Sequence, residues 1–240
     1  MTSLRINLWS SPRNLSTALM YSFAQRADTV VLDEPLYGHY LRHQPTKAEH
    51  PGREEVIEAQ PESGEEVVER LLYEDFGKPI LICKQMTHHL IDLSADFLLS
   101  MRNVLLIRDP RAILASYSRV VDEVTAYDVG LSRQLWLYEF LREAGMPPVV
   151  VDATRLRNDP EAQIAALCHR LGINFEPTML HWPDGPKPYD GVWAKYWYAG
   201  VHKSVAFKPI SDSRVSLPSD LETIADQYKD RYNTLLRQAL

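Results

Sequence analysis

Short apolar runs recur along the chain, each bounded by turn residues or charges. Five of them, with their flanking residues, have the length of β-strands: 4–9, 28–35, 78–84, 103–110 and 147–153. Their apolar residues follow one another instead of alternating with polar ones, which is typical of parallel strands buried on both faces. The pattern therefore predicts a mostly parallel sheet of about five strands.

Segments with helical spacing of apolar residues separate these runs. They cover residues 14–25, 65–76, 90–100, 111–121, 132–145, 159–172 and 221–240. Pro110 suits the first turn of one helix, and Gly145 and Gly172 suit the ends of two others. Strands that alternate with helices indicate an α/β fold with three layers, α/β/α.

Two segments lack this pattern. Residues 43–64 are polar and contain several prolines, which predicts a surface excursion. Residues 181–216 are rich in Pro, Trp, Tyr and Lys without periodicity, and we expect them to fold over the site. The length of 240 residues suits one domain, and we assign residues 1–240 to it.

Composition limits the classes of function. A net charge of −6 argues against broad nucleic-acid binding but allows a local basic pocket. Cys83 and Cys168 lie far apart in apolar runs, which predicts buried free thiols in a reducing compartment. The chain shows no signal-peptide pattern and no apolar run of bilayer length. We therefore expect a cytoplasmic protein that binds no membrane.

Cations follow several of the predicted strands. Arg13 comes after the first strand, Lys84 ends the third, and Arg108 and Arg111 follow the fourth; Arg155 follows the fifth. In open α/β sheets, ligands bind beyond the carboxyl ends of the strands. The convergence of Arg13, Lys84, Arg108 and Arg111 predicts an anionic ligand with more than one phosphate-like group.

The first strand leads into an unusual loop, "LWSSPRNLSTALMYSF" (residues 8–23). A helix that begins near Asn14 offers unpaired N–H groups to an anion, Arg13 adds a fixed charge, and Ser16 and Thr17 add hydroxyl donors. The loop has no glycine and no lysine, so it lacks the nucleotide-binding motif G-x-x-x-x-G-K-[ST] and a Mg²⁺–triphosphate site. Taken alone, it suits a phosphate or sulfate site and a capped helix equally well.

A second element, "RDPRAILASY", places Ser116 eight residues after Arg108, about two turns into the next helix. Together the two elements resemble the PAPS-dependent sulfotransferases, which use 3′-phosphoadenosine 5′-phosphosulfate and have a P-loop NTPase-like fold. The phosphosulfate loop of that family, Pro-(Lys/Arg)-Ser-Gly-Thr-(Thr/Ser), is matched by Pro12, Arg13, Asn14, Leu15, Ser16 and Thr17. Its 3′-phosphate element, Arg-(Asn/Asp)-Pro with a later serine, is matched by Arg108, Asp109, Pro110 and Ser116.

The resemblance extends over residues 4–182 and includes the strand and Asp-Pro helix start within 149–177. It implies that PAPS is the cofactor and PAP the product, with no metal. The implied cofactor-binding residues are Ser11, Pro12, Arg13, Asn14, Leu15, Ser16, Thr17, Arg108, Ser116 and Lys203. Leu15 departs from the family pattern because it stands where the family has glycine. For Lys203 a surface lysine is the favoured interpretation, although the family does place basic residues there.

The implied catalytic residues are Arg13, Glu34, Lys84 and His88. Arg13 would neutralise the charge that develops on the leaving phosphate, with help from Lys84. Glu34 is the first candidate for the base that takes the acceptor proton. Its alternatives are a role as a helix-start carboxylate for Glu34 itself, a shared role for Asp33, and His88 or His89 as the base.

The predicted function is transfer of a sulfuryl group from PAPS to a hydroxyl or amine of a small acceptor. The alternatives are a P-loop nucleotide kinase or hydrolase and a noncatalytic binding domain. The segments 43–64 and 181–216 are expected to shape the acceptor pocket. The aromatic residues of the second segment could line that pocket or the adenine site, or pack as core: Trp193, Tyr196, Trp197 and Tyr198.

Overall fold

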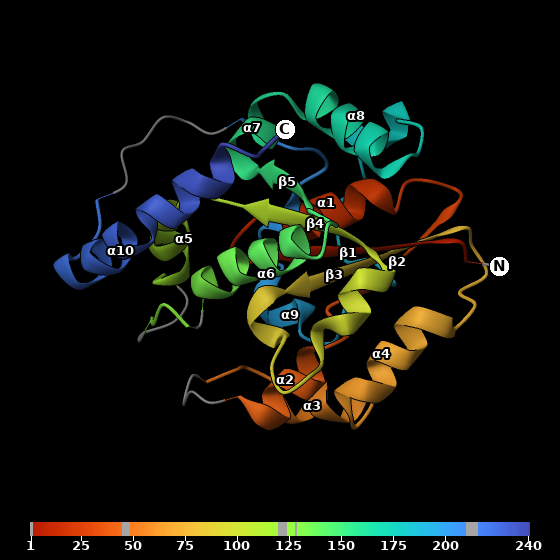
Figure 1. Ribbon diagram of the computed structural model, residues 1–240, viewed down its shortest axis with the longest axis horizontal. Helices are drawn as coiled ribbons and strands as arrows, with labels where there is room; N and C mark the ends of the chain where they lie inside the picture. The colour runs from red at the N-terminus through yellow and green to blue at the C-terminus, as the bar shows by residue number, and fades with distance from the viewer. Residues whose placement is uncertain (1, 45–48, 120–123, 128, 210–215) are drawn as a thin grey trace.

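The computed structural model describes residues 2–44, 49–119, 124–127, 129–209 and 216–240. Five parallel strands form one sheet in the order β2-β3-β1-β4-β5 (Figure 1). Their bounds are Leu4–Ser10 (β1), Thr29–Asp33 (β2), Ile80–Met86 (β3), Arg102–Ile107 (β4) and Val149–Asp152 (β5). The predicted α/β class and the parallel sheet of five strands are confirmed.

Consecutive residues of the strands enter two different hydrophobic clusters because side chains alternate across a sheet. Ile6 and Leu8 of β1 pack in the cluster that contains α1 (Ser16–Phe23) and α8 (Pro160–Leu171). Trp9, the next residue, packs in the opposite cluster with residues of α4 (Gly64–Tyr73), α6 (Leu131–Glu143) and α10 (Ser219–Leu236). Apolar residues on both faces of every strand thus produce the three layers.

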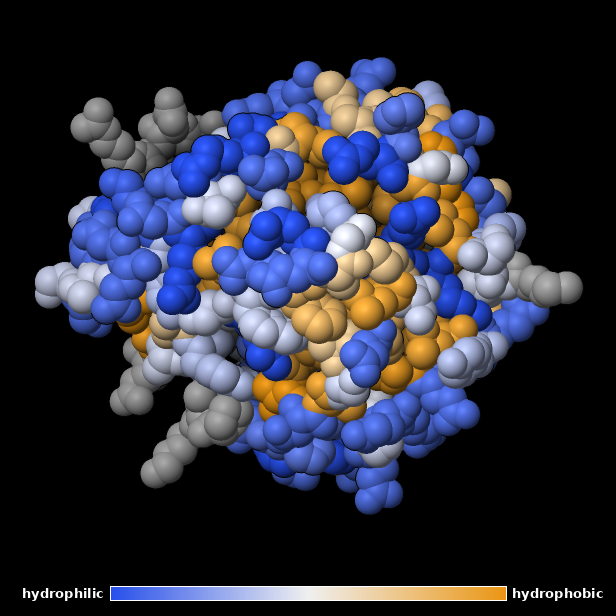
Figure 2. Space-filling view, viewed as in Figure 1, coloured by the Kyte–Doolittle hydropathy of each residue, from blue (hydrophilic) through white to orange (hydrophobic). Residues whose placement is uncertain are grey.

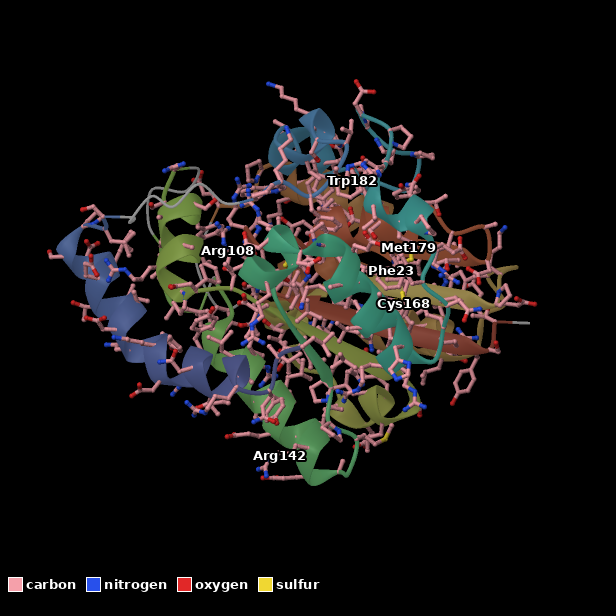
Figure 3. The ribbon with its side chains drawn as sticks, turned by 90° about the horizontal axis from the view of Figure 1, so that it is seen from above. Phe23, Arg108, Arg142, Cys168, Met179 and Trp182 are labelled. Atoms are coloured by element: carbon pink, nitrogen blue, oxygen red, sulfur yellow. The ribbon has the colours of Figure 1, made fainter. Side chains whose placement is uncertain are left out.

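The two cysteines lie in these two clusters and are unpaired, as predicted. Cys83 is buried on the α4/α6 side, and Cys168 is buried on the α1/α8 side. Figure 3 shows Cys168 close to Phe23 and Met179, and its Sγ lies 3.9 Å from the Sδ of Met179. Burial raises the pKa of Cys168 to about 11, so its thiol stays protonated at neutral pH.

The outer side of α10 is hydrophilic, as its amphipathic pattern predicts. Figure 2 shows polar residues over α10 and around the rim of the viewed face, with apolar residues toward its middle. Leu221, Ala225 and Leu235 of α10 are buried, while its other positions carry many charges. Within the described residues, no helix is long and apolar enough to cross a membrane.

The remaining elements differ more from the prediction. Residues 90–100, predicted as one helix, contain only the 3₁₀ turn η2 (Ala95–Ser100), because Ser94 caps it and Met101 already has extended backbone before β4. The segment 43–64, of which residues 45–48 lie outside the described part, contains α3 (Arg53–Ala59). Val56 of α3 is fully buried, so this polar stretch packs against the fold. The other elements are α2 (Tyr37–His43), η1 (Thr87–His89), α5 (Pro110–Tyr117), α7 (Ala153–Asn158), η3 (Pro177–Leu180), α9 (Ala194–Trp197) and η4 (Val201–Lys203).

Candidate functional site

A cavity of about 450 Å³ opens at the carboxyl ends of β1, β3 and β4. All the implied catalytic and cofactor-binding residues line it except Ser11 and Lys203. Residues of the segment 193–208 close its other side, among them Trp193, Trp197 and Tyr198. The position agrees with the rule that ligands bind beyond the carboxyl ends of parallel strands.

The loop after β1 presents the start of α1 to this cavity. Leu15 occupies the N-cap position without a side-chain cap, so the first amides of α1 have no partner within the helix or from a capping side chain. Asn14 Nδ2 donates to Leu106 O over 2.9 Å, which ties the loop to β4. The backbone of Leu15 is right-handed (φ −80°), and Arg13 takes the left-handed conformation instead (φ 56°). The loop therefore needs no glycine at position 15, and its strain lies at Arg13.

Three arginines gather at this end of the cavity, which we call the cofactor end: Arg13, Arg108 and Arg157. Arg13 Nε donates to Ser116 Oγ over 3.2 Å, and Arg108 donates to the carbonyl of Arg13. Burial lowers the pKa of Arg108, and the charges of Arg157 and Arg13 lower it further. None of the three arginines forms an ion pair with a carboxylate among the described residues. Cations that are partly buried and unpaired in this way favour an anionic ligand.

A buried ionic cluster lies farther along the cavity and consists of Asp33, Glu34, Lys84 and Tyr198. Lys84 Nζ donates to Asp33 Oδ1 (3.0 Å), to the Tyr198 hydroxyl (2.6 Å) and to Glu34 Oε1. The Tyr198 hydroxyl in turn donates to the Asp33 carboxylate, 2.9 Å from both oxygens. An ammonium group has three N–H donors, so every donor of Lys84 has an acceptor within the cluster.

Burial raises the pKa of Glu34, and repulsion from Asp33 adds to this, although Lys84 opposes it. Burial alone would lower the pKa of Lys84, but attraction to Asp33 and Glu34 outweighs it and the pKa is raised. Glu34 also has left-handed backbone (φ 40°), and its carbonyl accepts from Gln60 Nε2 over 2.9 Å. Its second oxygen, Oε2, lies 3.9 Å from His89 Nε2. A carboxyl group with a raised pKa and one oxygen outside the lysine bond has the properties of a general base.

His88 and His89 are both buried and both line the cavity. Burial lowers the pKa of His88 to about 3 and that of His89 well below its ordinary value. Both rings are therefore neutral at pH 7 and weak as bases. This favours Glu34 over either histidine, and the assignment of the base stays a prediction.

Several cationic residues lie elsewhere than predicted. Arg111 does not line the cavity, because it pairs with Glu222 of α10. Lys203 is exposed and outside the cavity, whereas Lys208, five residues later, lines it. Ser11 is buried at the end of β1 and does not line the cavity either.

Sequence reasoning also missed Arg157. Arg155, which follows β5 directly, binds the carbonyls of Ala239 and Leu240 instead of facing the cavity. Arg157, two residues later on α7, lines the cavity, and its Nε donates to Lys208 O over 2.5 Å. Residues two positions apart on a helix do not share a face, so the side chains of Arg155 and Arg157 point in different directions. Assigning a helix to residues 153–158 from the sequence would have predicted that Arg155 and Arg157 lie on different faces.

No group of three or more His, Cys, Asp or Glu side chains that could hold a metal ion occurs in the described part of the chain. This finding concerns only the residues present and does not bear on the reaction.

Comparison with known proteins places this fold. A family model described as a sulfotransferase domain matches residues 4–220. The sulfotransferase domain from the curacin biosynthetic pathway superposes with a TM-score of 0.60 at 17% identity, covering 96% of this chain and 98% of that chain. A sulfotransferase from Alicyclobacillus acidocaldarius superposes with a TM-score of 0.58 at 12% identity, covering 100% and 98%. At such identities the two structures show the fold alone.

A curated relative carries a different name. Branched-chain-amino-acid aminotransferase-like protein 1 from Arabidopsis thaliana is 38% identical over 231 residues, which are 96% of this chain and 41% of that protein. The chain thus spans less than half the length of this relative. The activity of the longer protein is therefore not carried over to this chain.

Proposed function

Because the chain belongs to the sulfotransferase-domain family, we propose that it transfers a sulfuryl group from PAPS to a hydroxyl or amine group of a small acceptor. One observation carries the proposal. The two ends of a single cavity hold complementary groups: unpaired arginines beside a helix N-terminus at one end, and a buried carboxyl group with a raised pKa at the other.

The donor set at the cofactor end fits PAPS. This molecule has two anionic ends, a phosphosulfate and a 3′-phosphate, and the cavity offers two groups of donors. The phosphosulfate would be held by Arg13, the amides that begin α1, and the hydroxyls of Ser16 and Thr17. The 3′-phosphate would be held by Arg108, Ser116 and Arg157.

PAPS supplies the activated sulfuryl group in this reaction. Arg13 stabilises the negative charge that develops on the departing phosphate oxygen, which is the main contribution that a protein makes to this kind of transfer. Glu34 receives the proton of the acceptor at Oε2. Lys84 holds Oε1 and thereby fixes the direction of the second oxygen. The role of Lys84 is positioning, since all its donors are engaged.

Calorimetric titration with PAP tests the proposal. We expect binding to the native chain, and Arg108→Ala should raise the Kd by about 10- to 100-fold, the range for a hydrogen bond to a charged group. Arg111→Ala is the matched control, because Arg111 pairs with Glu222 outside the cavity and its loss should leave the Kd within twofold.

Absence of PAP binding at high protein concentration would overturn the proposal. Tight PAP binding without transfer to any acceptor in a broad screen would favour the alternative of a noncatalytic binding domain.

A further inference from the structure

The part of the cavity around Glu34, which we call the acceptor end, is walled by aromatic rings. Tyr37 stacks on His89 with ring centroids 4.9 Å apart and an angle of 5° between the planes. Trp193 meets Tyr37 edge to face at 5.2 Å, and His50 does so at 5.7 Å. The Tyr37 hydroxyl is 2.8 Å from His50 Nδ1. Because these rings hold one another, the flat walls exist before any acceptor binds.

Among the described residues, no lysine or arginine at the acceptor end is left to pair with an anionic ligand. The arginines that line the cavity lie at the cofactor end, beside Ser116 and the loop after β1, and so does Lys208, whose carbonyl accepts from Arg157. Lys84 reaches this part, but its three N–H donors are already engaged by Asp33, Glu34 and Tyr198. The two buried histidines there, His88 and His89, are neutral at pH 7.

The charge that this end does carry is negative. Glu34 is the one carboxylate among the described residues that line the cavity. An anionic group on the acceptor would lose its hydration against aromatic rings, would find no partner cation, and would be repelled by Glu34. An ammonium group would instead be attracted by the ring faces and by the carboxylate.

Resting on the proposed function, we propose that the acceptor is an uncharged or cationic molecule with a flat ring, and that the site rejects ring compounds carrying an anionic group. The selection comes from the uneven distribution of charge along one cavity. The end that binds an anion is separated from the end that binds the acceptor, so two anions are not drawn to the same place.

Three phenols that share a ring and a hydroxyl group test this inference: tyramine, 4-hydroxyphenylacetamide and 4-hydroxyphenylacetate. Their side chains are cationic, neutral and anionic, and the last two have nearly the same shape. Each is titrated calorimetrically into the full chain saturated with PAP at pH 8, where an ordinary imidazole is neutral. Transfer from PAPS is measured in parallel as kcat/KM.

We expect the carboxylate to bind roughly 30-fold more weakly than the amide, as a desolvated like charge requires. Tyramine should bind as well as the amide or a few-fold better. Glu34→Gln should narrow the difference between the amide and the carboxylate in the binding measurement. Trp197→Leu should weaken all three, whereas Tyr196→Leu, a change at an exposed neighbour that does not line the cavity, should weaken none.

The outcomes separate the two proposals. Failure of PAP itself to bind overturns the proposed function, and this inference falls with it. If PAP binds but the carboxylate binds as tightly as the amide, or none of the three phenols binds, the inference is overturned and the proposed function stands.

Discussion

The two ends of the cavity differ in whether their buried charges are paired within the protein. At the cofactor end, Arg13, Arg108 and Arg157 lie close together with no carboxylate in an ion pair with them in the described part of the chain. At the acceptor end, Lys84 is enclosed by Asp33, Glu34 and Tyr198, and every donor it has is used. The arginines of one end lack a counter-charge without a ligand, whereas the ionic cluster around Lys84 at the other end is satisfied within the protein.

This difference indicates that the unpaired arginines of the cofactor end serve ligand binding, whereas the ionic cluster of the acceptor end belongs to the folded state. Unpaired cations that repel one another reduce stability, so their presence indicates that a ligand supplies the missing charge. A buried lysine with two carboxylates, by contrast, is paired within the folded protein, and removing its charge would leave the carboxylates buried without a cation. Strain is present at both ends, at Arg13 and at Glu34, which have left-handed backbone without being glycine.

Lys84→Met gives the largest expected effect and tests the ionic cluster at the acceptor end. It leaves Asp33 and Glu34 buried without their cation, which should lower the free energy of unfolding by about 3–5 kcal/mol. Urea denaturation at pH 7 measures the loss. Lys78→Met is the control, because Lys78 is exposed and donates to the carbonyl of Ala27 outside the cluster.

Where Lys84→Met proves too unstable to fold, the double variant Glu34→Gln/Lys84→Met should recover part of the loss, since it removes one of the two uncompensated charges. A loss below about 1 kcal/mol in the single variant would contradict the idea that this cluster supports the fold.

The cofactor end could be predicted from the sequence because its parts are local. The loop 12–17 follows a strand directly, and Arg108 and Ser116 are joined by one helix, so spacing alone brings each set to the carboxyl edge. The sheet was predictable for a similar reason: continuous apolar runs have few alternatives to parallel strands.

The acceptor end could not be predicted in the same way, because it is assembled from segments far apart in the chain. Tyr198 meets Lys84 across more than a hundred residues, and Gln60 supports Glu34 from beside α3, within a stretch that looked like a polar excursion. The positions of Arg111 and Lys203 outside the cavity, and of Arg157 within it, were not predictable for another reason. Residues a few positions apart on short helices and turns point in different directions, and apolar periodicity is too weak there to fix the direction.

Glu34→Gln gives the next largest effect and tests the base. With 4-hydroxyphenylacetamide as acceptor, kcat should fall by about 10²- to 10⁴-fold, the usual contribution of a positioned base. Because burial raises the pKa of Glu34, its ionised form appears only above the ordinary carboxyl range, so the native rate should rise with pH through that pKa. The variant should lose this rise while the Kd for PAP stays within twofold.

A pH–rate profile that keeps its acid limb in Glu34→Gln would contradict this role. If His88→Gln then removed the limb, the base would be His88.

Arg157→Ala gives the smallest effect and tests the cofactor end. Removing one of the three arginines should raise the Kd for PAP by about 10-fold, the lower range for a hydrogen bond to a charged group. The free energy of unfolding should fall only slightly, because the variant loses the bonds of Arg157 to the carbonyls of Lys208 and Pro209 but relieves the repulsion that helps to lower the pKa of Arg108. Arg155→Ala, two residues away on the same helix, is the matched control: it loses two comparable bonds, to the carbonyls of Ala239 and Leu240, and should leave the PAP affinity unchanged. Equal effects of the two variants on the Kd for PAP would mean that overall positive charge determines the affinity of the cofactor end, and that the arginines facing the cavity do not.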